Sequence, residues 1–430
     1  MSRTTVFAAG ALVALALAGC APTQVSNSNA QKDVQNGTLR VWLFSEVAQA
    51  PKEAVVQSAI QEFERAHSGV KVETQYIPVA TRAARFTAAF NAPNSAPDVA
   101  EIGNTDLATY VANGGLADLT GAIKGWDVAP NIDKSVLAAT QVRGANYAIP
   151  WFVGVRALYY RTDVFTELGL KPPTTMAEIA QDAKAIRAAK PNMVGIAAGG
   201  AYQYAAMPYI WANGGELAKA STGGSFTGAL DTPQARKGVA AYTALLSPEI
   251  CPVQTCAQWG GNDSVAQFSS GGAGMTFGGD FNLKGVQQSV VGKKFAVIPT
   301  PGVTAGTIAP AFAGGNDLAV FRSSQHKTLG TQFAQLLAGK KYQRKMFDAM
   351  GNLPTLTDVR TQVATAAPQT KPFIDTLAAG TKFVPVTSGW SAIDSDAVIA
   401  NMLQAIATGK ADVNAATSTA TTKMNSDFAK

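Results

Sequence analysis

Several polar side chains stand in loops directly after predicted strands, where open α/β sheets bind their ligands. Each is a carboxylate or an amide, and such groups fix the hydroxyls of a small ligand by hydrogen bonds. Glycines beside two of them let the backbone approach a ligand closely. We predict ligand contacts from Glu46, Asn104, Asp106 and Asp280 in such loops, and from Asn316, which stands in Gly-Gly-Asn-Asp ahead of a predicted strand.

Some of these assignments have alternatives. Asp106 equally fits the N-cap of a following helix, and Asp317 could bind in place of its neighbour Asn316. Arg82 and Arg156 are weaker candidates for ligand contacts, and Arg156 equally fits a structural ion pair with a nearby carboxylate.

Aromatic side chains near glycines or in loops could supply flat walls for a ligand with apolar faces. Of the six tryptophans, Trp151, Trp211 and Trp390 stand in such places, and Phe281 follows Asp280. Packing in the core is the alternative for each tryptophan. We predict that these four aromatic residues contact the ligand.

The composition excludes several other kinds of site. The chain has only two histidines and no H-E-x-x-H, which argues against a metal enzyme and predicts no metal and no cofactor. It also lacks G-x-S-x-G, a dinucleotide fingerprint and the P-loop pattern. The net charge of +6 comes from scattered Lys and Arg residues, so we expect no nucleic-acid partner.

The start of the chain carries the pattern of an export signal. A short stretch with Arg3 precedes an apolar run over 6–18, which is too short to span a bilayer comfortably. Leu-Ala-Gly-Cys then ends at Cys20, which predicts a signal peptide over 1–19 and a lipid on the Cys20 thiol. An ordinary secretory signal is the alternative. The polar residues of 20–36 predict a flexible tether.

The other two cysteines, Cys251 and Cys256, lie in CPVQTC. Disulfides persist in exported proteins, and a bridge here would close a very short loop. A metal-binding pair is the weaker alternative, because no further soft ligand is evident.

The order of predicted elements indicates an α/β fold. Strands near 39–44, 70–74 and 97–102 alternate with helices near 54–66 and 81–90, which predicts a parallel sheet covered by helices. A second strand and helix series follows from about 144 to 298, and the later part is mostly helical. We therefore predict two α/β lobes.

Several segments, in order, resemble the family-1 extracellular solute-binding proteins, the sugar-binding components of bacterial ABC importers. The most diagnostic stretch is NYAIPWFVGVRALYYRTDVFTELGLKPPTTMAEIAQDAKAI, and IQEFERAHSGVKVE, WANGGE, GAGMTFGGDF, AGGNDLAVF and GNLPTLTDV also match. The resemblance covers nearly the whole chain after the export signal.

This resemblance implies a two-lobed, periplasmic-binding-protein-like clamp of type II with the ligand in the cleft between its lobes. The transferred boundaries are 37–148 plus 316–352 for the N-terminal lobe, and 149–315 plus 353–430 for the C-terminal lobe. It also implies a monomeric, membrane-anchored receptor that binds a carbohydrate and delivers it to permease subunits with a separate ATPase. The segment AIPWFVGVRALYYRTDVF favours a di- or oligosaccharide, with an amino sugar such as chitobiose among the candidates.

Two alternatives remain open at this point. The same clamp could bind a glycerophosphodiester, a peptide or a polyamine. A glycan-hydrolysing enzyme would need two carboxylates spaced across the scissile bond, and Glu46, Asp106 and Asp280 could serve in principle. Because the resemblance is to binding proteins, we expect no enzymatic activity.

Overall fold

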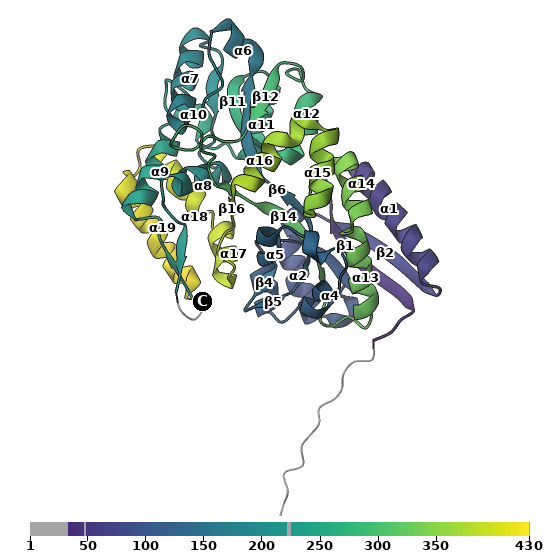
Figure 1. The fold of residues 1–430 in the computed structure, drawn as a ribbon. Helices are drawn as coiled ribbons and strands as arrows, with labels where there is room; N and C mark the ends of the chain where they lie inside the picture. Colours follow the sequence, from purple (N-terminus) through teal and green to yellow (C-terminus); the bar gives the residue numbers. More distant parts are fainter. Residues whose placement is uncertain (1–32, 47–48, 222–224, 430) are drawn as a thin grey trace, which may run out of the picture. The chain divides into compact units, whose positions relative to one another are not determined.

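The computed structural model describes residues 33–46, 49–221 and 225–429. Within them lie two α/β lobes, each built around its own sheet (Figure 1). The predicted signal peptide, Cys20 and most of the predicted tether lie outside the described residues. No helix in the described part of the chain is long and apolar enough to cross a membrane.

The N-terminal lobe is centred on a six-stranded sheet with the strand order β15-β6-β14-β3-β1-β2. β2, β1 and β3 pair in parallel, as the alternation of strands and helices predicts. β14 pairs antiparallel with both β3 and β6, and β15 pairs antiparallel with β6, so the sheet is mixed. The strands are β1 (Gly37–Phe44), β2 (Val70–Ile77), β3 (Val99–Gly103), β6 (Ile149–Gly154), β14 (Gly314–Val320) and β15 (Leu353–Pro354).

Helices cover both faces of the inner part of this sheet, whereas the edge strand β2 leaves Lys71 and Glu73 exposed. Leu39, Val41 and Leu43 of β1 pack against the apolar stripe of α1, while Ile102 of β3 packs with α2 and α3 on the other face. The helices of this lobe are α1 (Gln49–Ala66), α2 (Arg82–Asn91), α3 (Leu107–Ala112), α4 (Thr120–Lys124), α5 (Lys134–Ala138), α13 (Lys327–Leu337), α14 (Lys340–Met350) and α15 (Thr357–Ala366), with a small hairpin of β4 (Gln141–Val142) and β5 (Ala145–Asn146).

The C-terminal lobe has a four-stranded sheet with the order β12-β7-β11-β8. Its strands are β7 (Arg156–Arg161), β8 (Val194–Ala197), β11 (Ala273–Gly279) and β12 (Phe295–Ile298), and two short pairs join β9 (Ala218–Ala220) to β10 (Phe226–Gly228) and β13 (Ala311–Phe312) to β16 (Thr381–Lys382). Its helices are α6 (Thr162–Glu167), α7 (Met176–Ala189), α8 (Gln203–Ala212), α9 (Pro233–Thr243), α10 (Val253–Cys256), α11 (Gly261–Ser269), α12 (Leu283–Gln287), α16 (Lys371–Ala379), α17 (Ser388–Ser395), α18 (Val398–Ala407) and α19 (Val413–Phe428).

The chain crosses between the lobes at places that differ from the predicted boundaries. β6 belongs to the N-terminal sheet and β7 to the C-terminal one, so the first crossing is at Val155 and not at 149. The second crossing is at Ala313, between β13 and β14, and not at 316. β15 pairs in the N-terminal sheet and α15 packs against it, so the third crossing follows α15 and not residue 352. Sheet pairing, which the sequence does not reveal, sets these limits.

The described end of the predicted tether is attached to the N-terminal lobe. The Val34 N–H donates to the Gln325 carbonyl at 2.7 Å, and the Thr328 N–H donates to Asp33 Oδ1 at 3.3 Å. Residues 33–36 of the predicted tether therefore belong to the N-terminal lobe.

A disulfide joins Cys251 to Cys256. Both cysteines are fully buried, and the loop that they close packs on the turn after β8, where the Gly200 N–H donates to the Cys256 carbonyl at 3.0 Å. The bond therefore fixes a local turn of the C-terminal lobe.

Removing this disulfide is expected to lower the free energy of unfolding by about 2 kcal/mol, since it closes a short loop. Chemical denaturation of the Cys251→Ala/Cys256→Ala variant beside the parent protein measures the difference. A reducing agent should destabilise the parent by a similar amount and leave the variant unchanged. Equal sensitivity of the two proteins would contradict a bond between these thiols.

Candidate functional site

A cleft of about 550 Å³ lies where the two lobes face each other. A larger hollow of about 620 Å³ lies between α1, α13 and α14, but only the N-terminal lobe lines it. The cleft is the better candidate because both lobes line it and it contains buried charged groups. Its lining comprises Phe44, Glu46, Val79, Arg82, Gly103, Asn104, Thr105, Asp106, Phe152, Val153, Gly154, Arg156, Tyr204, Asp280, Phe281, Phe312, Gly314, Gly315, Asn316, Asn352 and Asp394.

A buried lysine supports the N-terminal wall of the cleft. Lys52 of α1 is fully buried, and its Nζ lies 2.9 Å from Glu46 Oε1 and 2.8 Å from Glu101 Oε2. Burial alone would lower the pKa of Lys52, but attraction to Glu101 and Glu46 outweighs burial and raises it. Lys52 is therefore charged at neutral pH, and Glu46 is held at the edge of the cleft.

Two asparagines complete this wall. Asn316 Nδ2 donates to Glu101 Oε1 at 2.5 Å, and Asn104 Nδ2 donates to the Ala313 carbonyl at 3.2 Å. β14 has a bulge between Asn316 and Asp317. The preceding Gly315 has φ +154°, and a Cβ there would lie 2.4 Å from the Phe152 carbonyl oxygen. Only glycine fits this close approach.

An ion pair lies at the other end of the N-terminal wall. Arg82 Nε donates to Asp106 Oδ2 at 2.6 Å, and Asp106 makes no side-chain cap to α3. Burial raises the pKa of Asp106, Arg82 opposes this rise, and the nearby Asp394 adds to it. The carboxylate thus binds the arginine and not the helix terminus.

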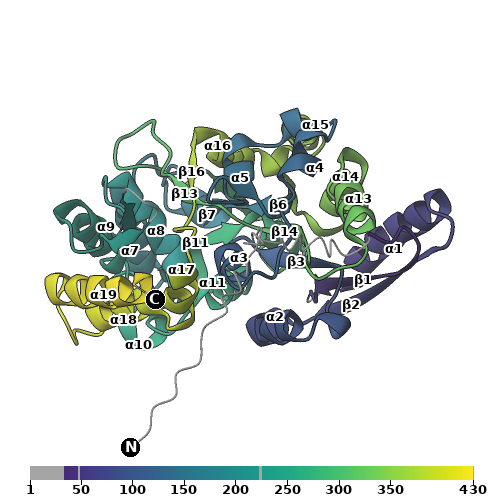
Figure 2. The same cartoon turned by 90° about the horizontal axis from the view of Figure 1, so that it is seen from below.

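Asp394 brings the C-terminal lobe to this ion pair. It lies on α17, which packs beside α3 (Figure 2). Across this contact, Thr109 Oγ1 lies 2.7 Å from Ser391 Oγ. Asp394 Oδ1 accepts hydrogen bonds from Gln203 Nε2 at 2.7 Å and Tyr204 OH at 3.2 Å. Carboxylates from both lobes therefore face the same end of the cleft.

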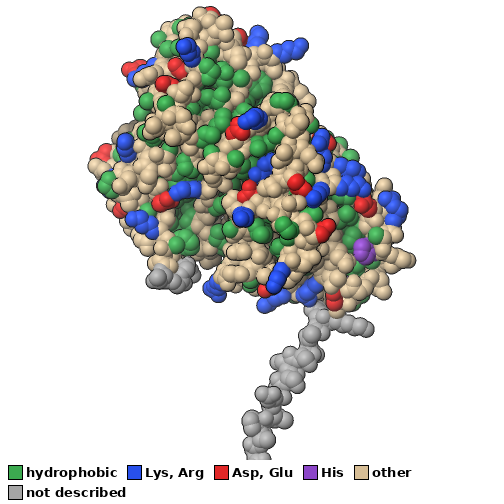
Figure 3. All heavy atoms as spheres, in the orientation of Figure 1, with side chains coloured by type: hydrophobic (Ala, Val, Ile, Leu, Met, Phe, Trp, Pro, Cys, Tyr) green, Lys and Arg blue, Asp and Glu red, His purple; other side chains and the backbone are tan. Residues whose placement is uncertain are grey.

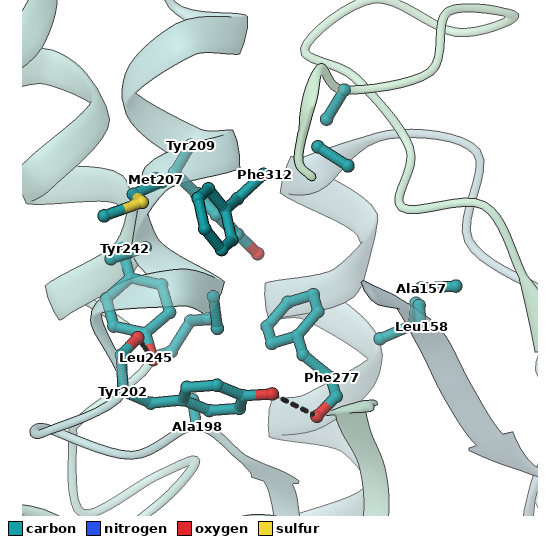
Figure 4. Packing of buried hydrophobic residues seen from close by; sticks show 14 of the residues in the cluster. Ala157, Leu158, Ala198, Tyr202, Met207, Tyr209, Tyr242, Leu245, Phe277 and Phe312 are labelled. Atoms are coloured by element: carbon teal, nitrogen blue, oxygen red, sulfur yellow. Dashed lines mark hydrogen bonds between the residues drawn. The ribbon is translucent and has the colours of Figure 1, made fainter. Parts of the chain in front are cut away.

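Aromatic rings and an arginine form the C-terminal wall. The Arg156 guanidinium lies over the rings of Tyr202, Tyr204 and Phe281 at 4.8–5.6 Å. Its Nε donates to Tyr202 OH at 2.9 Å, and this hydroxyl donates to the Phe277 carbonyl at 3.2 Å (Figure 4). Among the described residues Arg156 forms no ion pair, so the alternative of a structural pair is not realised.

The flat surfaces needed for a ligand with apolar faces come from this wall. Tyr204 stacks on Phe312 with ring centroids 4.8 Å apart. Phe281 is 46% exposed, which is unusual for so large an apolar side chain. Exposed rings beside fixed polar groups suit a ligand with C–H faces and a rim of hydroxyls.

Asp280 ties the C-terminal wall to the first lobe crossing. It is almost fully buried, and its Oδ1 accepts a hydrogen bond from the Val155 N–H at 2.8 Å. Burial raises the pKa of Asp280 to about 7, although backbone donors and Arg156 oppose this. This carboxyl with a raised pKa lies at a point where the chain changes lobes.

The structure brings most of the predicted ligand residues together. Eight of them line the cleft, and their contact with a ligand stays a prediction: Glu46, Arg82, Asn104, Asp106, Arg156, Asp280, Phe281 and Asn316. Among the described residues no group of His, Cys, Asp and Glu is arranged to hold a metal ion.

The prediction that three tryptophans contact the ligand is corrected, because none of them lines the cleft. Trp151, Trp211 and Trp390 are 0%, 5% and 1% exposed and pack in the hydrophobic cores of the lobes. Their loop-like sequence context misled the prediction, since Trp151 lies in β6, Trp211 in α8 and Trp390 in α17. Tyr204, Phe281 and Phe312 supply the aromatic surfaces instead.

The buried pair beneath the N-terminal wall was missed, although the sequence contains a signal for it. Lys52 lies on the apolar stripe of α1 with Val55, Val56 and Ala59, where a charge is costly. Glu101 is the single acid in the buried strand β3. Two opposite charges at core positions predict a buried pair.

Asp317, the alternative to Asn316, does not line the cleft. It is 3% exposed, and its Oδ2 has no hydrogen-bond partner in the described structure. Burial raises the pKa of Asp317 to about 8. The native state therefore binds a proton that the unfolded chain releases near pH 4.

Stability should consequently fall as the pH rises from about 5 to 7, by about 1.4 kcal/mol per pH unit from Asp317 alone. Asp280 adds a contribution of the same sign. In Asp317→Asn, the free energy of unfolding should fall less steeply with pH, because the contribution of Asp317 is removed. Urea denaturation of variant and parent at pH 5, 6 and 7 measures both slopes. An identical slope in variant and parent would rule out a raised pKa at Asp317.

Comparison with known proteins agrees with this architecture. Residues 24–344 match the family model for bacterial extracellular solute-binding proteins. The diacetylchitobiose-binding protein DasA of Streptomyces coelicolor is 27% identical over 337 residues, which cover 77% of each chain. The galactooligosaccharide-binding protein of Bacillus subtilis is 24% identical over 422 residues, which cover 95% of this chain and 93% of that one.

A solved structure shows the same fold. The sugar-binding protein MalE from the phytopathogen Xanthomonas citri superimposes with a TM-score of 0.80 at 22% identity, over 91% of this chain and 98% of that one. The fold is therefore the two-lobed α/β clamp of periplasmic binding proteins. Since the family model spans well over half of the sequence, the chain belongs to the bacterial extracellular solute-binding protein family.

Proposed function

We propose that this protein is the substrate receptor of a bacterial ABC importer and that its ligand is a carbohydrate, a di- or oligosaccharide. The observation that carries the proposal is the cleft itself, in which the exposed ring of Phe281 faces fixed carboxylates and amides across a space of about 550 Å³. The names of relatives that bind diacetylchitobiose and galactooligosaccharide support it.

Binding would proceed by closure of the two lobes. A ligand that touches both walls stabilises the closed form relative to the open one, so binding shifts the population toward closure. Val155 and Ala313 are the crossing points where the backbone would adjust. Permease subunits would recognise the closed form, and their ATPase is a separate chain.

A ligand screen tests the carbohydrate proposal. The mature chain without lipid, from Ala21 onward, is heated with disaccharides, chito-oligomers, glycerophosphodiesters, peptides and polyamines. A saccharide present at a hundredfold excess over its Kd should stabilise the protein by about 2.7 kcal/mol. Stabilisation by a peptide, a polyamine or a glycerophosphodiester, with no effect of any saccharide, would refute the carbohydrate assignment and keep the clamp.

We also propose that the protein is held on the outer side of the cell membrane by a lipid on Cys20. The sequence Leu-Ala-Gly-Cys at 17–20 supports this, and the family is extracellular. The described fold begins by Asp33, so a linker of about a dozen residues would separate the lipid from the N-terminal lobe.

Cys20→Ser should move the protein from the membrane fraction to the soluble exported fraction, because the thiol is the attachment point. Fractionation followed by immunoblotting measures the change, and metabolic labelling with a tagged fatty acid should label only the parent. Retention of the serine variant in the membrane, with labelling intact, would place the anchor elsewhere.

A further inference from the structure

The ammonium group of Lys52 uses all three of its hydrogen-bond donors inside the protein. Nζ donates to the Phe44 carbonyl at 2.9 Å, to Glu46 Oε1 at 2.9 Å and to Glu101 Oε2 at 2.8 Å. The group is completely shielded from solvent. It therefore offers no donor to a ligand, but it holds one oxygen of each carboxylate in place.

The Glu101 carboxylate in turn fixes the orientation of Asn316. Glu101 Oε2 already accepts from Lys52 and from the Phe44 N–H at 2.7 Å, and Oε1 accepts from Asn316. A carboxylate can only accept, so Asn316 must present its NH2 group to Glu101. Its carbonyl oxygen Oδ1 is left to face the cleft that Asn316 lines.

Two more side chains of this wall, Asn104 and Glu46, also leave an acceptor oxygen unused by the protein. Asn104 must turn its NH2 group toward the Ala313 carbonyl, which leaves its Oδ1 free. Glu46 Oε1 accepts a hydrogen bond from Lys52 Nζ, and the Glu46 side chain is 32% exposed. Among the described residues none of the three remaining oxygens, Glu46 Oε2, Asn104 Oδ1 and Asn316 Oδ1, accepts a hydrogen bond, and all three residues line the cleft.

We propose that the buried Lys52–Glu101 pair helps to orient the part of the N-terminal wall formed by Glu46, Asn104 and Asn316, here called the acceptor wall, so that these three side chains offer only acceptors and select ligand groups that donate. Lys52 and Glu101 are positioning residues, since neither lines the cleft. The matching ligand presents neighbouring hydroxyl or amine donors on one edge. This inference rests on the proposed carbohydrate function and specifies which hydrogen-bonding groups of the carbohydrate the protein recognises.

An acceptor wall predicts a particular pattern of discrimination. A C–F bond, or a methyl ether, can accept weakly but cannot donate, whereas a hydroxyl does both. Replacing a hydroxyl by fluorine should therefore be as damaging as deleting it wherever that hydroxyl meets this wall. A wall that also donated would tolerate fluorine better than hydrogen at the same position.

The first arm of the test measures Kd by calorimetry. The probe is whichever of maltose, trehalose, cellobiose, N,N′-diacetylchitobiose and galactobiose binds tightest, with its deoxy and deoxyfluoro analogues. At one or more ring positions, both analogues should bind at least about tenfold more weakly than the parent sugar. Tight binding of every deoxyfluoro analogue would overturn the proposal.

Glu101→Gln provides the decisive variant, because a glutamine can donate to Asn316 Oδ1 and turn the Asn316 NH2 group toward the cleft. The fluorine penalty is the factor by which the Kd rises when fluorine replaces the hydroxyl at that ring position. In Glu101→Gln this factor should be at least about threefold smaller than in the parent protein. Glu73→Gln is the matched control, since Glu73 is exposed in β2 of the same sheet, and its penalty should equal that of the parent. A penalty unchanged in Glu101→Gln would overturn the proposal.

The second arm needs no ligand and separates this inference from the proposed function. In an asparagine-labelled sample, the side-chain amide protons of Asn316, identified by their loss in Asn316→Asp, should exchange slowly in the parent. They should exchange at least about tenfold faster in Glu101→Gln, where the NH2 group faces the cleft. Fast exchange in the parent would overturn the inference, whereas failure of every saccharide to bind would refute only the proposed function.

Discussion

Replacing Lys52 with methionine is expected to lower the free energy of unfolding by about 3–5 kcal/mol. The variant leaves Glu101, which is fully buried, without its cation, and an unpaired buried charge is far more costly than a lost surface contact. Urea denaturation at neutral pH measures the difference. The same variant should also release Glu46 from the edge of the cleft.

Two further variants identify the cause of that loss. Lys71→Met removes a lysine that is 71% exposed and should change the stability by less than about 0.5 kcal/mol. Lys52→Met/Glu101→Gln removes both charges and should recover part of the stability. If the double variant is no more stable than Lys52→Met, the destabilisation does not come from the uncompensated Glu101 charge.

Trp390→Ala should destabilise the C-terminal lobe by about 3–5 kcal/mol, because the ring is 1% exposed and its removal leaves a large cavity. Trp390→Phe, which fills most of the space, should lose much less. Denaturation curves give the stabilities, and binding of the screened saccharide to the folded fraction should weaken only modestly. Native-like stability combined with abolished binding would instead place the Trp390 ring against the ligand.

The alternation of strands and helices in the sequence predicts the parallel core of the first sheet, because period-two and helical patterns are local properties. The polar groups after strands were predictable for a similar reason. Glu46, Asn104 and Asp106 follow strands whose ends meet at one edge of a sheet, so their chemistry and position together indicate a site.

The aromatic surfaces were not predictable in this way. Trp151 and Phe152 are neighbours in β6, yet successive side chains in a strand point to opposite faces. Trp151 is fully buried, and Phe152 lines the cleft. Which of the two faces is the core depends on the pairing of β6 between β14 and β15, which are distant in sequence.

The charged surface agrees with a binding site confined to the cleft. Lys and Arg side chains are spread over both lobes on the face shown in Figure 3, with acidic and apolar groups between them. The net charge of +6 is therefore not gathered into one stripe on that face. The proposed recognition of the ligand rests instead on the fixed groups that line the cleft.

The most direct test of the account is calorimetric titration of the chain from Ala21 onward with the saccharide that stabilises it most, beside the same chain carrying Phe281→Ala. We predict saturable binding of one ligand per chain, weakened at least about tenfold (about 1.4 kcal/mol) when the exposed ring is removed. Phe226→Ala, which alters a partly buried ring outside the cleft, should bind as the parent does. Unchanged saccharide affinity in Phe281→Ala, or binding of a non-saccharide alone, would contradict a carbohydrate site between these walls.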